Sequence, residues 1–507
     1  MIKKAIKDYP ELLLLTLTSL ITLAYFSLGI DHWKFSFVGD EWPFYLLAHN
    51  YITMGYPTDI FSFAGAHGEN AVIGSVYQAL FLDIFGPSNI AWRMSNIILI
   101  IPISFFFYFW LTQVFGKQTA LLSTLLLQTS YFLSNYFKIG YINPQALLLL
   151  VISLYLATKC GIERKARYFL ILGLVMGLGF YIYIGPLIPV IIFPFLLPVF
   201  FGKETNSHTS KGTVLIRNLK TNLSSRAFYR NALLLLGGYI LLLSPIINAG
   251  FDISGPTSKS FLEREFTDSS QIYINIFHNF LLFYKNFDYL YNHFISGAYV
   301  DPITQILVLF GTLYSVYMVR KRSYLMLLLS YISCCVIIGF TSPYAYTPTT
   351  RGIFFIPFAA TFAGIGLSYL LGQMKRYKEI FAVTTISSIF ILNLIYSQYI
   401  VFQQSGYTTS SLFVKELLTA KAQEDTTPIV LILSSSFAYH PEYFESMKTA
   451  YELQEVQFSI IRDFQATCQR IEASKTFILG HDTAMVQKAN ALPCAMEITT
   501  LRGDIQI

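Results

Sequence analysis

The sequence predicts a polytopic α-helical membrane protein with about eleven transmembrane helices and a small C-terminal α/β domain. Of its 507 residues 54% are hydrophobic and 13% are charged, about half the charged share of a soluble globular chain. The charges between Glu11 and Ile400 occur in short clusters separated by long apolar runs, whereas the composition from about Gln403 onward is that of a soluble domain. We therefore predict a transmembrane region over residues 1–402 and a separate domain over residues 403–507.

The first apolar run extends from Leu12 to about Ile30. It is longer than the apolar part of a secretory signal and no small-residue cleavage pattern follows it, so we predict an uncleaved first span. Further runs have about 16–20 residues, near the length that crosses a bilayer core. The predicted spans are 11–30, 92–111, 119–135, 142–158, 167–184, 186–201, 232–249, 303–319, 323–340, 352–371 and 380–397.

The basic residues predict the orientation of these spans. With the N-terminus in the cytoplasm, 20 of the 35 Lys and Arg fall in cytoplasmic segments, seven lie near the outer surface and eight belong to the C-terminal domain. This asymmetry follows the positive-inside rule. We therefore expect a multi-pass cell-membrane protein with an extracytoplasmic C-terminus, whose basic clusters contact membrane lipids and not nucleic acid.

Two predicted outer loops are long, one over residues 31–91 and the other over residues 250–302. Loops of this length between spans are uncommon unless they carry function. The moderately apolar stretch from Ala71 to Phe85 in the first loop is typical of an interfacial helix that lies along the membrane. Another span there would reverse the charge pattern downstream.

The C-terminal domain alternates strand and helix patterns, which indicates a small α/β sheet. It has no phosphate-binding glycine loop, and we assign it no catalytic role. Cys468 and Cys494 lie in this domain, either as a disulfide or as two buried thiols, whereas Cys160 is expected in a cytoplasmic loop. Strands are predicted near 428–434, 456–461, 475–480 and 496–500, and helices over 411–423, 442–454, up to 472 and over 483–491.

The adjacent acids Asp40 and Glu41 follow the first span and stand among aromatic residues. Carboxylates in such surroundings are costly to bury and need a partner or a chemical role. The alternative is that they cap a helix beginning at Trp42 or Pro43.

Three cations stand at predicted outer ends of spans: Arg93, Lys138 and Arg351. Each is compatible with headgroup contact by snorkelling. Together with the acids they predict a site for a lipid-linked phosphate, because Arg offers a bidentate fork. His67 and Tyr183 are added as candidate substrate-binding residues, although His67 is too isolated for a metal ligand and Tyr183 is typical of the interfacial aromatic belt.

The ordered motifs resemble the GT-C glycosyltransferases, in particular the branch of protein O-mannosyltransferases and lipid A aminoarabinose transferases. Over residues 10–400 the chain has one N-terminal span and then a series of motifs in the family's order. These motifs are Asp40-Glu41, Gly86–Arg93, Ser134–Tyr141, Gly177–Tyr183 and Thr350–Pro357.

This resemblance implies transfer of a sugar from a polyprenyl-phosphate carrier to an acceptor protein, lipid or glycan on the outer face, with inversion at the anomeric carbon. Asp40 then serves as the base for the acceptor hydroxyl, and Glu41 orients Asp40, the acceptor or a divalent cation. Arg93 and Arg351, with Lys138 as a weaker candidate, stabilise the phosphate leaving group. No cofactor is otherwise implied.

The chain departs from the family at two places. Gly68–Ala71 stands where a lysine-proline pair often contributes to phosphate binding, and Tyr141–Pro144 stands where a second acid is often found. The WWDYG signature is absent, which argues against transfer of a whole lipid-linked oligosaccharide. The alternative is a non-enzymatic transporter or lipid flippase, but no internal repeat is visible and the ionisable residues gather at one surface and not at mid-span.

Overall fold

The structure is a computed structural model of the 507-residue chain. It describes residues 10–31, 37, 41–63, 65–66, 71–201, 221–222, 224–248, 269–284, 295, 297–342, 349–374, 376–399, 429–433, 441–453, 457–461, 476–480 and 499–502. Asp40, His67, Cys468, Cys494 and the predicted boundary between residues 402 and 403 lie outside these ranges.

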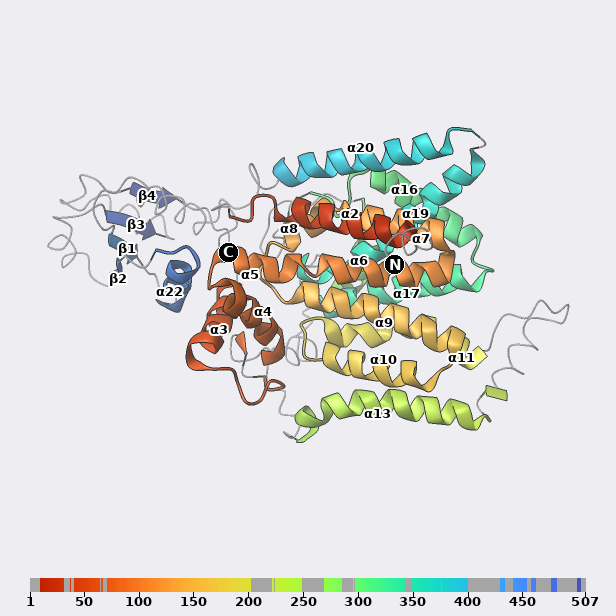
Figure 1. The fold of residues 1–507 in the computed structure, drawn as a ribbon, viewed down its shortest axis with the longest axis horizontal. Coiled ribbons are helices and arrows are strands. Elements are labelled where there is room, and N and C mark those ends of the chain that lie inside the picture. The colour runs from red at the N-terminus through yellow and green to blue at the C-terminus, as the bar shows by residue number, and fades with distance from the viewer. Residues whose placement is uncertain are drawn as a thin grey trace.

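Long helices lie side by side in a bundle, with the C-terminal sheet beyond one of its ends (Figure 1). The bundle helices are α2 (Pro10–Ser27), α5 (Asn89–Ile97), α6 (Ile100–Phe115), α7 (Lys117–Gln128), α8 (Tyr131–Tyr136), α9 (Asn143–Glu163), α10 (Ala166–Gly179), α11 (Ile188–Phe201), α13 (Arg226–Asn248), α16 (Pro302–Tyr317), α17 (Arg322–Thr341), α19 (Ile356–Gln373) and α20 (Lys378–Tyr399). Short turns precede two of them: η3 (Gly185–Leu187) before α11, and α18 (Thr349–Gly352) with η4 (Ile353–Phe355) before α19.

Each predicted span coincides with one of these helices or with two consecutive ones, which confirms the polytopic helical class. Seven helices among the described residues are long and apolar enough to cross a membrane by themselves. The total of eleven therefore stays a prediction. One loop prediction is wrong: α9 continues to Glu163, so Cys160 is buried within a helix and not in a loop.

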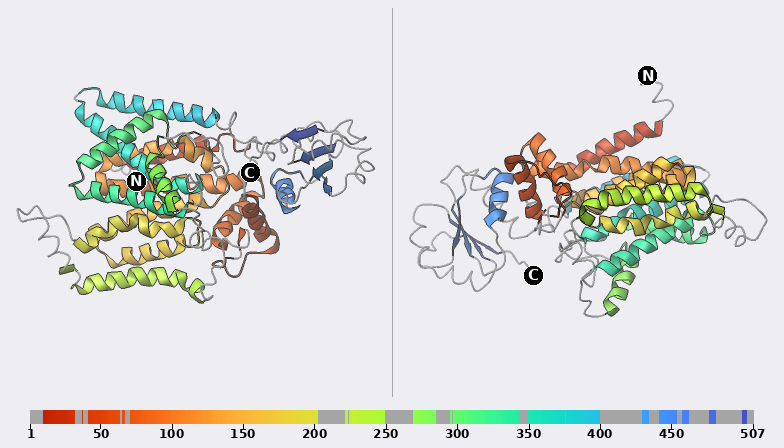
Figure 2. Two further views of the ribbon diagram at one scale, coloured as in Figure 1. Left: turned by 180° about the vertical axis from the view of Figure 1, so that it is seen from behind. Right: turned by 90° about the horizontal axis from the view of Figure 1, so that it is seen from below.

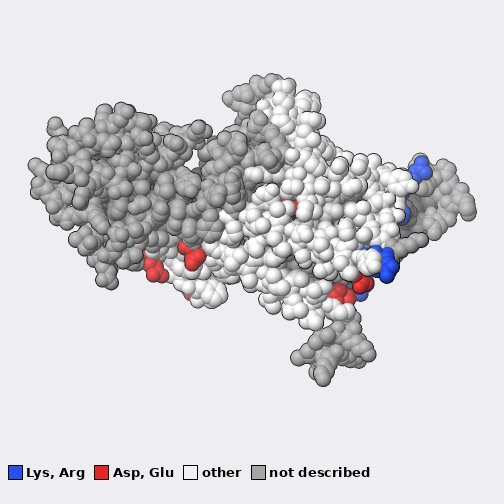
Figure 3. All heavy atoms as spheres, turned by 90° about the horizontal axis from the view of Figure 1, so that it is seen from above, with Lys and Arg blue, Asp and Glu red and all other residues white. Residues whose placement is uncertain are grey.

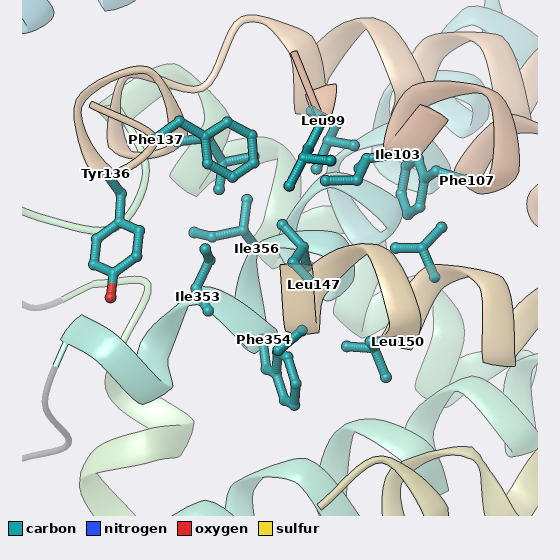
Figure 4. Packing of buried hydrophobic residues seen from close by; sticks show 14 of the residues in the cluster. Leu99, Ile103, Phe107, Tyr136, Phe137, Leu147, Leu150, Ile353, Phe354 and Ile356 are labelled. Carbon is teal, nitrogen blue, oxygen red and sulfur yellow. The ribbon is translucent and has the colours of Figure 1, made fainter. Parts of the chain in front are cut away.

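The core of the bundle is formed around α19 and α9. In the most apolar 18-residue stretch of each span, 83% of the residues are buried for the span that contains α19 and 67% for α9. The corresponding share is 17% in both α13 and α20. Figure 4 shows Leu147 and Leu150 of α9 packing close to Phe354 and Ile356, from segments about 200 residues apart in sequence. The apolar segments of α13 and α20 are thus mostly unburied, as expected for helices at the edge of a membrane-embedded bundle.

The first long loop forms two helices that lie at one end of the bundle, as expected for interfacial helices (Figures 1 and 2). These are α3 (Glu41–Met54) and α4 (Val72–Phe85), which pack against each other. We call this end the loop end. The sequence did not predict α15 (Ser269–Leu281), a helix in the second long loop that packs against α17. Its polar side contacts α17 because Asn275 donates to the carbonyl of Ser342.

The C-terminal region contains a four-stranded parallel sheet with strand order β2-β1-β3-β4 and one described helix, α22 (Pro441–Ala450). The strands β1 (Ile429–Leu433), β2 (Gln457–Ile461), β3 (Thr476–Gly480) and β4 (Thr499–Arg502) overlap the four segments in which strands were predicted. The predicted helices over 411–423, up to 472 and over 483–491 lie outside the described residues. The parallel pairing agrees with the predicted alternation of strands and helices.

Charged side chains mark the end of the bundle opposite the loop end. In Figure 3 the visible Lys and Arg gather at this end, and the broad face between it and the loop end shows no Lys or Arg and little acid. Lys117 pairs with Glu11 there, and Glu163 pairs with Lys159 and Lys165. We call this end the basic end.

Candidate active site

Glu41 is the first residue of α3 and is completely buried. One of its carboxylate oxygens, Oε1, accepts three hydrogen bonds. These come from the Arg93 guanidinium, from Trp92 Nε1 at 2.6 Å and from the Gly140 backbone N–H at 2.8 Å. The donors belong to α5 and to the loop between α8 and α9, so Glu41 joins three separate segments instead of capping its own helix.

Arg93 is also completely buried, and its Nε donates to Asn89 Oδ1 at 3.0 Å. The Asn89 amide in turn donates to the Ile30 carbonyl at 3.0 Å, after the end of α2. Burial of two opposite charges is tolerated only with close geometry and satisfied hydrogen bonds, and removal of one partner costs about 3–5 kcal/mol. The Glu41–Arg93 pair therefore fixes the start of α3 against α5.

The loop between α8 and α9 is held at its backbone. Gln78 of α4 donates to the Gly140 carbonyl at 2.7 Å, and Asn96 of α5 donates to the carbonyls of Ile139 and Tyr141 at 2.9 and 2.8 Å. A Cβ on Gly140 would lie 2.0 Å from Trp92 Nε1, so this close approach requires glycine. The loop conformation is consequently set by the same segments that hold Glu41.

Lys138 lies in this loop and its side chain is completely buried. Burial lowers the pKa of Lys138 from 10.5 to about 7, because desolvation disfavours the ammonium form. A lysine in this range changes its charge near neutral pH. Such a group is a functional candidate because perturbed pKa values concentrate at active sites.

Arg351 lies in α18 with 1% of its surface exposed. Asn143, at the start of α9, donates to the Thr350 carbonyl at 2.6 Å. A Cβ on Gly352 would lie 2.0 Å from the Tyr299 hydroxyl. Because contacts hold both sides of Arg351, its backbone has a fixed place beside the start of α9.

Aromatic stacking connects the Lys138 loop to the Arg351 segment. Phe132 of α8 stacks on Tyr299 with ring centroids 4.5 Å apart, and on Tyr136 at 5.8 Å. Figure 4 shows Tyr136 beside Ile353, which lies two residues after Arg351. Four buried ionisable residues far apart in sequence are thus carried on segments in direct contact: Glu41, Arg93, Lys138 and Arg351.

Comparison with known proteins identifies the fold. A sequence profile described as dolichyl-phosphate-mannose-protein mannosyltransferase matches residues 70–216. The structure of ArnT from Cupriavidus metallidurans in the apo state has a TM-score of 0.52 at 11% identity, covering 96% of this chain and 95% of that one. The fold is that of the GT-C glycosyltransferases. The resemblance that the motifs indicated is confirmed.

Two other GT-C structures are similar to the chain. ArnT bound to undecaprenyl phosphate has a TM-score of 0.50 at 11% identity, covering 97% of this chain and 90% of that one. The Archaeoglobus fulgidus oligosaccharyltransferase, tethered to an acceptor peptide with the NVT sequon, has a TM-score of 0.50 at 14% identity, covering 96% of this chain and 68% of that one. No curated protein sequence matches the chain.

In this GT-C fold the four described ionisable candidates gather at the loop end. Tyr183 is partly buried, within electrostatic range of Tyr136. The sequence did not reveal the roles of Trp92, Asn143 and Tyr299. Trp92 stands in the motif that ends at Arg93, and Asn143 stands where a second acid was expected. The motifs therefore drew attention to both positions, but they did not predict which residues these side chains contact.

Among the residues that the structure describes, no three His, Cys, Asp or Glu side chains are close enough together to hold a metal ion.

Proposed function

We propose that this GT-C chain transfers a sugar from a polyprenyl-phosphate carrier to an acceptor hydroxyl, with inversion, at the extracytoplasmic face of the membrane. The observation that carries the proposal is the gathering of buried acid and basic side chains at one end of a lipid-facing bundle. A phosphate leaving group needs positive charge and no proton at neutral pH, which suits buried cations. The exposed apolar surfaces of α13 and α20 would lie against lipid. A polyprenyl chain in the bilayer could therefore reach the loop end of the bundle.

In the proposed mechanism the two adjacent acids, Asp40 and Glu41, have different roles. Asp40 takes the proton from the acceptor hydroxyl as the acceptor oxygen attacks the anomeric carbon. Glu41 fixes the backbone next to Asp40, since its carboxylate accepts from Arg93, Trp92 and Gly140. The bond between the anomeric carbon and the phosphate oxygen breaks, and the electron pair leaves with the carrier phosphate.

The cations are proposed to act unequally on that phosphate. Arg93 is paired with Glu41, so its charge is largely compensated in the described structure. Arg351 and Lys138 are therefore assigned the main phosphate contacts, with Arg351 as the bidentate donor. Tyr183, near Tyr136, and His67 are retained as candidate sugar or acceptor contacts.

The orientation is part of the same proposal. The loop end faces the extracytoplasmic side and the basic end faces the cytoplasm, in accordance with the positive-inside rule. The separation of charges in Figure 3 supports this orientation.

The test offers purified full-length protein a panel of polyprenyl-phosphate sugars and measures transfer to acceptors and donor hydrolysis. We expect Asp40→Asn to reduce transfer at least 100-fold, since general bases contribute about 10²–10⁴ in rate, while the carrier still binds. Asp31→Asn is the matched control, because Asp31 is an exposed acid of the same loop. Full activity of Asp40→Asn would remove Asp40 from the mechanism, and no turnover of any donor by the wild type would contradict the function.

A further inference from the structure

The C-terminal region is packed onto the loop end by its helix α22. This helix contacts α3, as Figure 1 and Figure 2 also show. Met447 and Leu453 have 0% and 1% of their surface exposed, and they belong to the same hydrophobic cluster as Tyr45 and Trp92. A continuous apolar core therefore joins the C-terminal region to the segments that hold Glu41.

A turn closes the C-terminal end of α22 at Tyr451. The N–H of Leu453 donates to the Lys448 carbonyl at 2.8 Å, and the N–H of Glu452 donates to the Thr449 carbonyl at 3.4 Å. Glu452 has a left-handed backbone with φ of 55°. These features define a Schellman turn, which satisfies carbonyls in the last turn of α22 and closes its end. Tyr451, at the cap position, is 8% exposed.

The Tyr451 hydroxyl lies at the buried ion pair. It is within hydrogen-bonding reach of Arg93 and interacts electrostatically with Glu41 and with Tyr45. Burial raises the pKa of Tyr451, which keeps the hydroxyl neutral at physiological pH. A neutral tyrosine hydroxyl that accepts a hydrogen bond still has one O–H group to donate.

Simple packing of α22 on α3 would not require this hydroxyl. A buried hydroxyl costs free energy unless it is hydrogen-bonded, and a phenylalanine would fill the same space. Its partner here is the guanidinium that holds Glu41, and Glu41 directly follows Asp40. Contacts thus extend from the C-terminal region to Glu41, the residue that follows the proposed base in sequence.

We propose that Tyr451 is a positioning residue of the active site, supplied by the C-terminal region when α22 docks on α3. It holds Arg93 in the geometry that fixes Glu41 at the start of α3, next in sequence to Asp40. This inference rests on the proposed function, and it gives the C-terminal region a role in transfer that the sequence did not assign.

The experiment compares full-length wild type, Tyr451→Phe and Tyr451→Ala. Tyr451→Phe removes the hydroxyl but keeps the ring, so we expect kcat for sugar transfer to fall about tenfold with the donor KM unchanged, because a hydrogen bond to a charged group is lost. Hydrogen exchange of the α22 amides should stay as in the wild type, which shows that docking persists. Tyr451→Ala should lose both activity and protection of α22.

Tyr25→Phe is the matched control. The Tyr25 hydroxyl is buried and donates to the Asn393 carbonyl at 3.3 Å, away from the ion pair. We expect no change in its kcat. Wild-type kcat in Tyr451→Phe, or an equal loss in Tyr25→Phe, would overturn the positioning role.

A failure of the proposed function gives a different result. If the wild type turns over no polyprenyl-phosphate sugar, exchange at the start of α3 still tests the contact. Tyr451→Phe should then exchange faster than the wild type at the first amides of α3, while Tyr25→Phe should not. Equal exchange in all three proteins would reject the contact itself.

Discussion

The two ends of the helix bundle carry the same kinds of charged residue in opposite surroundings. At the basic end, side chains such as Lys117 and Lys165 are 68% and 57% exposed, and their ion pairs are solvated. At the loop end, Glu41 and Arg93 are completely buried. Solvated pairs contribute little to stability, whereas buried charges are costly and persist only with partners or a function. The difference in burial is what directs the proposed chemistry to the loop end.

The largest effect is expected from removal of the Glu41 carboxylate. Glu41→Ala leaves the Arg93 guanidinium buried without its counter-charge and should lower the free energy of unfolding by about 3–5 kcal/mol. Thermal unfolding of the detergent-solubilised protein measures this loss. Glu11→Ala at the basic end is the control and should unfold at the wild-type temperature, because its pair with Lys117 is solvated. Equal effects of the two variants would erase the contrast between the ends.

The next effect concerns catalysis at Arg351. Arg351→Lys keeps the charge but loses the planar fork, so we expect transfer to fall about 100-fold, within the range for removal of one stabilising donor. Steady-state kinetics with a polyprenyl-phosphate sugar measure this loss. Arg320→Lys at the basic end is the matched control and should transfer as the wild type does. Wild-type transfer by Arg351→Lys would exclude bidentate binding.

The last effect is the pH dependence of donor binding, which should follow Lys138. Its folded pKa is lowered to about 7, so the ammonium form predominates below that pH and the neutral amine above it. Donor affinity should be constant below pH 7 and fall up to tenfold per pH unit above, because the sugar-phosphate diester keeps its charge throughout. Equilibrium binding between pH 6 and pH 9 measures this slope.

Lys138→Arg provides the control for this slope. Its guanidinium stays protonated over the whole range, so the variant should bind with no dependence on pH. The same slope in Lys138→Arg as in the wild type would assign the titration to another group.

Much of the architecture was predictable from local patterns. Apolar runs long enough to cross a bilayer coincide with the bundle helices. Lipid offers no hydrogen-bond partners to the backbone, so a membrane-spanning segment must pair its own N–H and C=O groups, as an α-helix does. The interfacial character of α3 and α4 followed from the charge distribution. The second long loop was less predictable, since α15 has a mixed composition and is stabilised by its contacts with α17.

The sequence predicted four ionisable residues of the candidate site but not their arrangement. Composition and the ordered motifs selected Glu41, Arg93, Lys138 and Arg351, because ionised side chains near the ends of apolar spans are conspicuous. Their pairing was not predictable, since Glu41 contacts Arg93 across 52 positions and Gly140 across 99. A pattern within a short stretch of sequence cannot indicate contacts between residues that are so far apart in the chain.

By itself the sequence determined a lipid-embedded helical bundle and the kinds of charge gathered at each end, because hydropathy and charge act on each segment independently. Only the tertiary structure decided that Glu41 is an anchor between segments, that Gly140 must lack a side chain, and that Tyr451 from the far end of the chain reaches Arg93. These are contacts between side chains from distant segments, and their geometry exists only once the helices have packed.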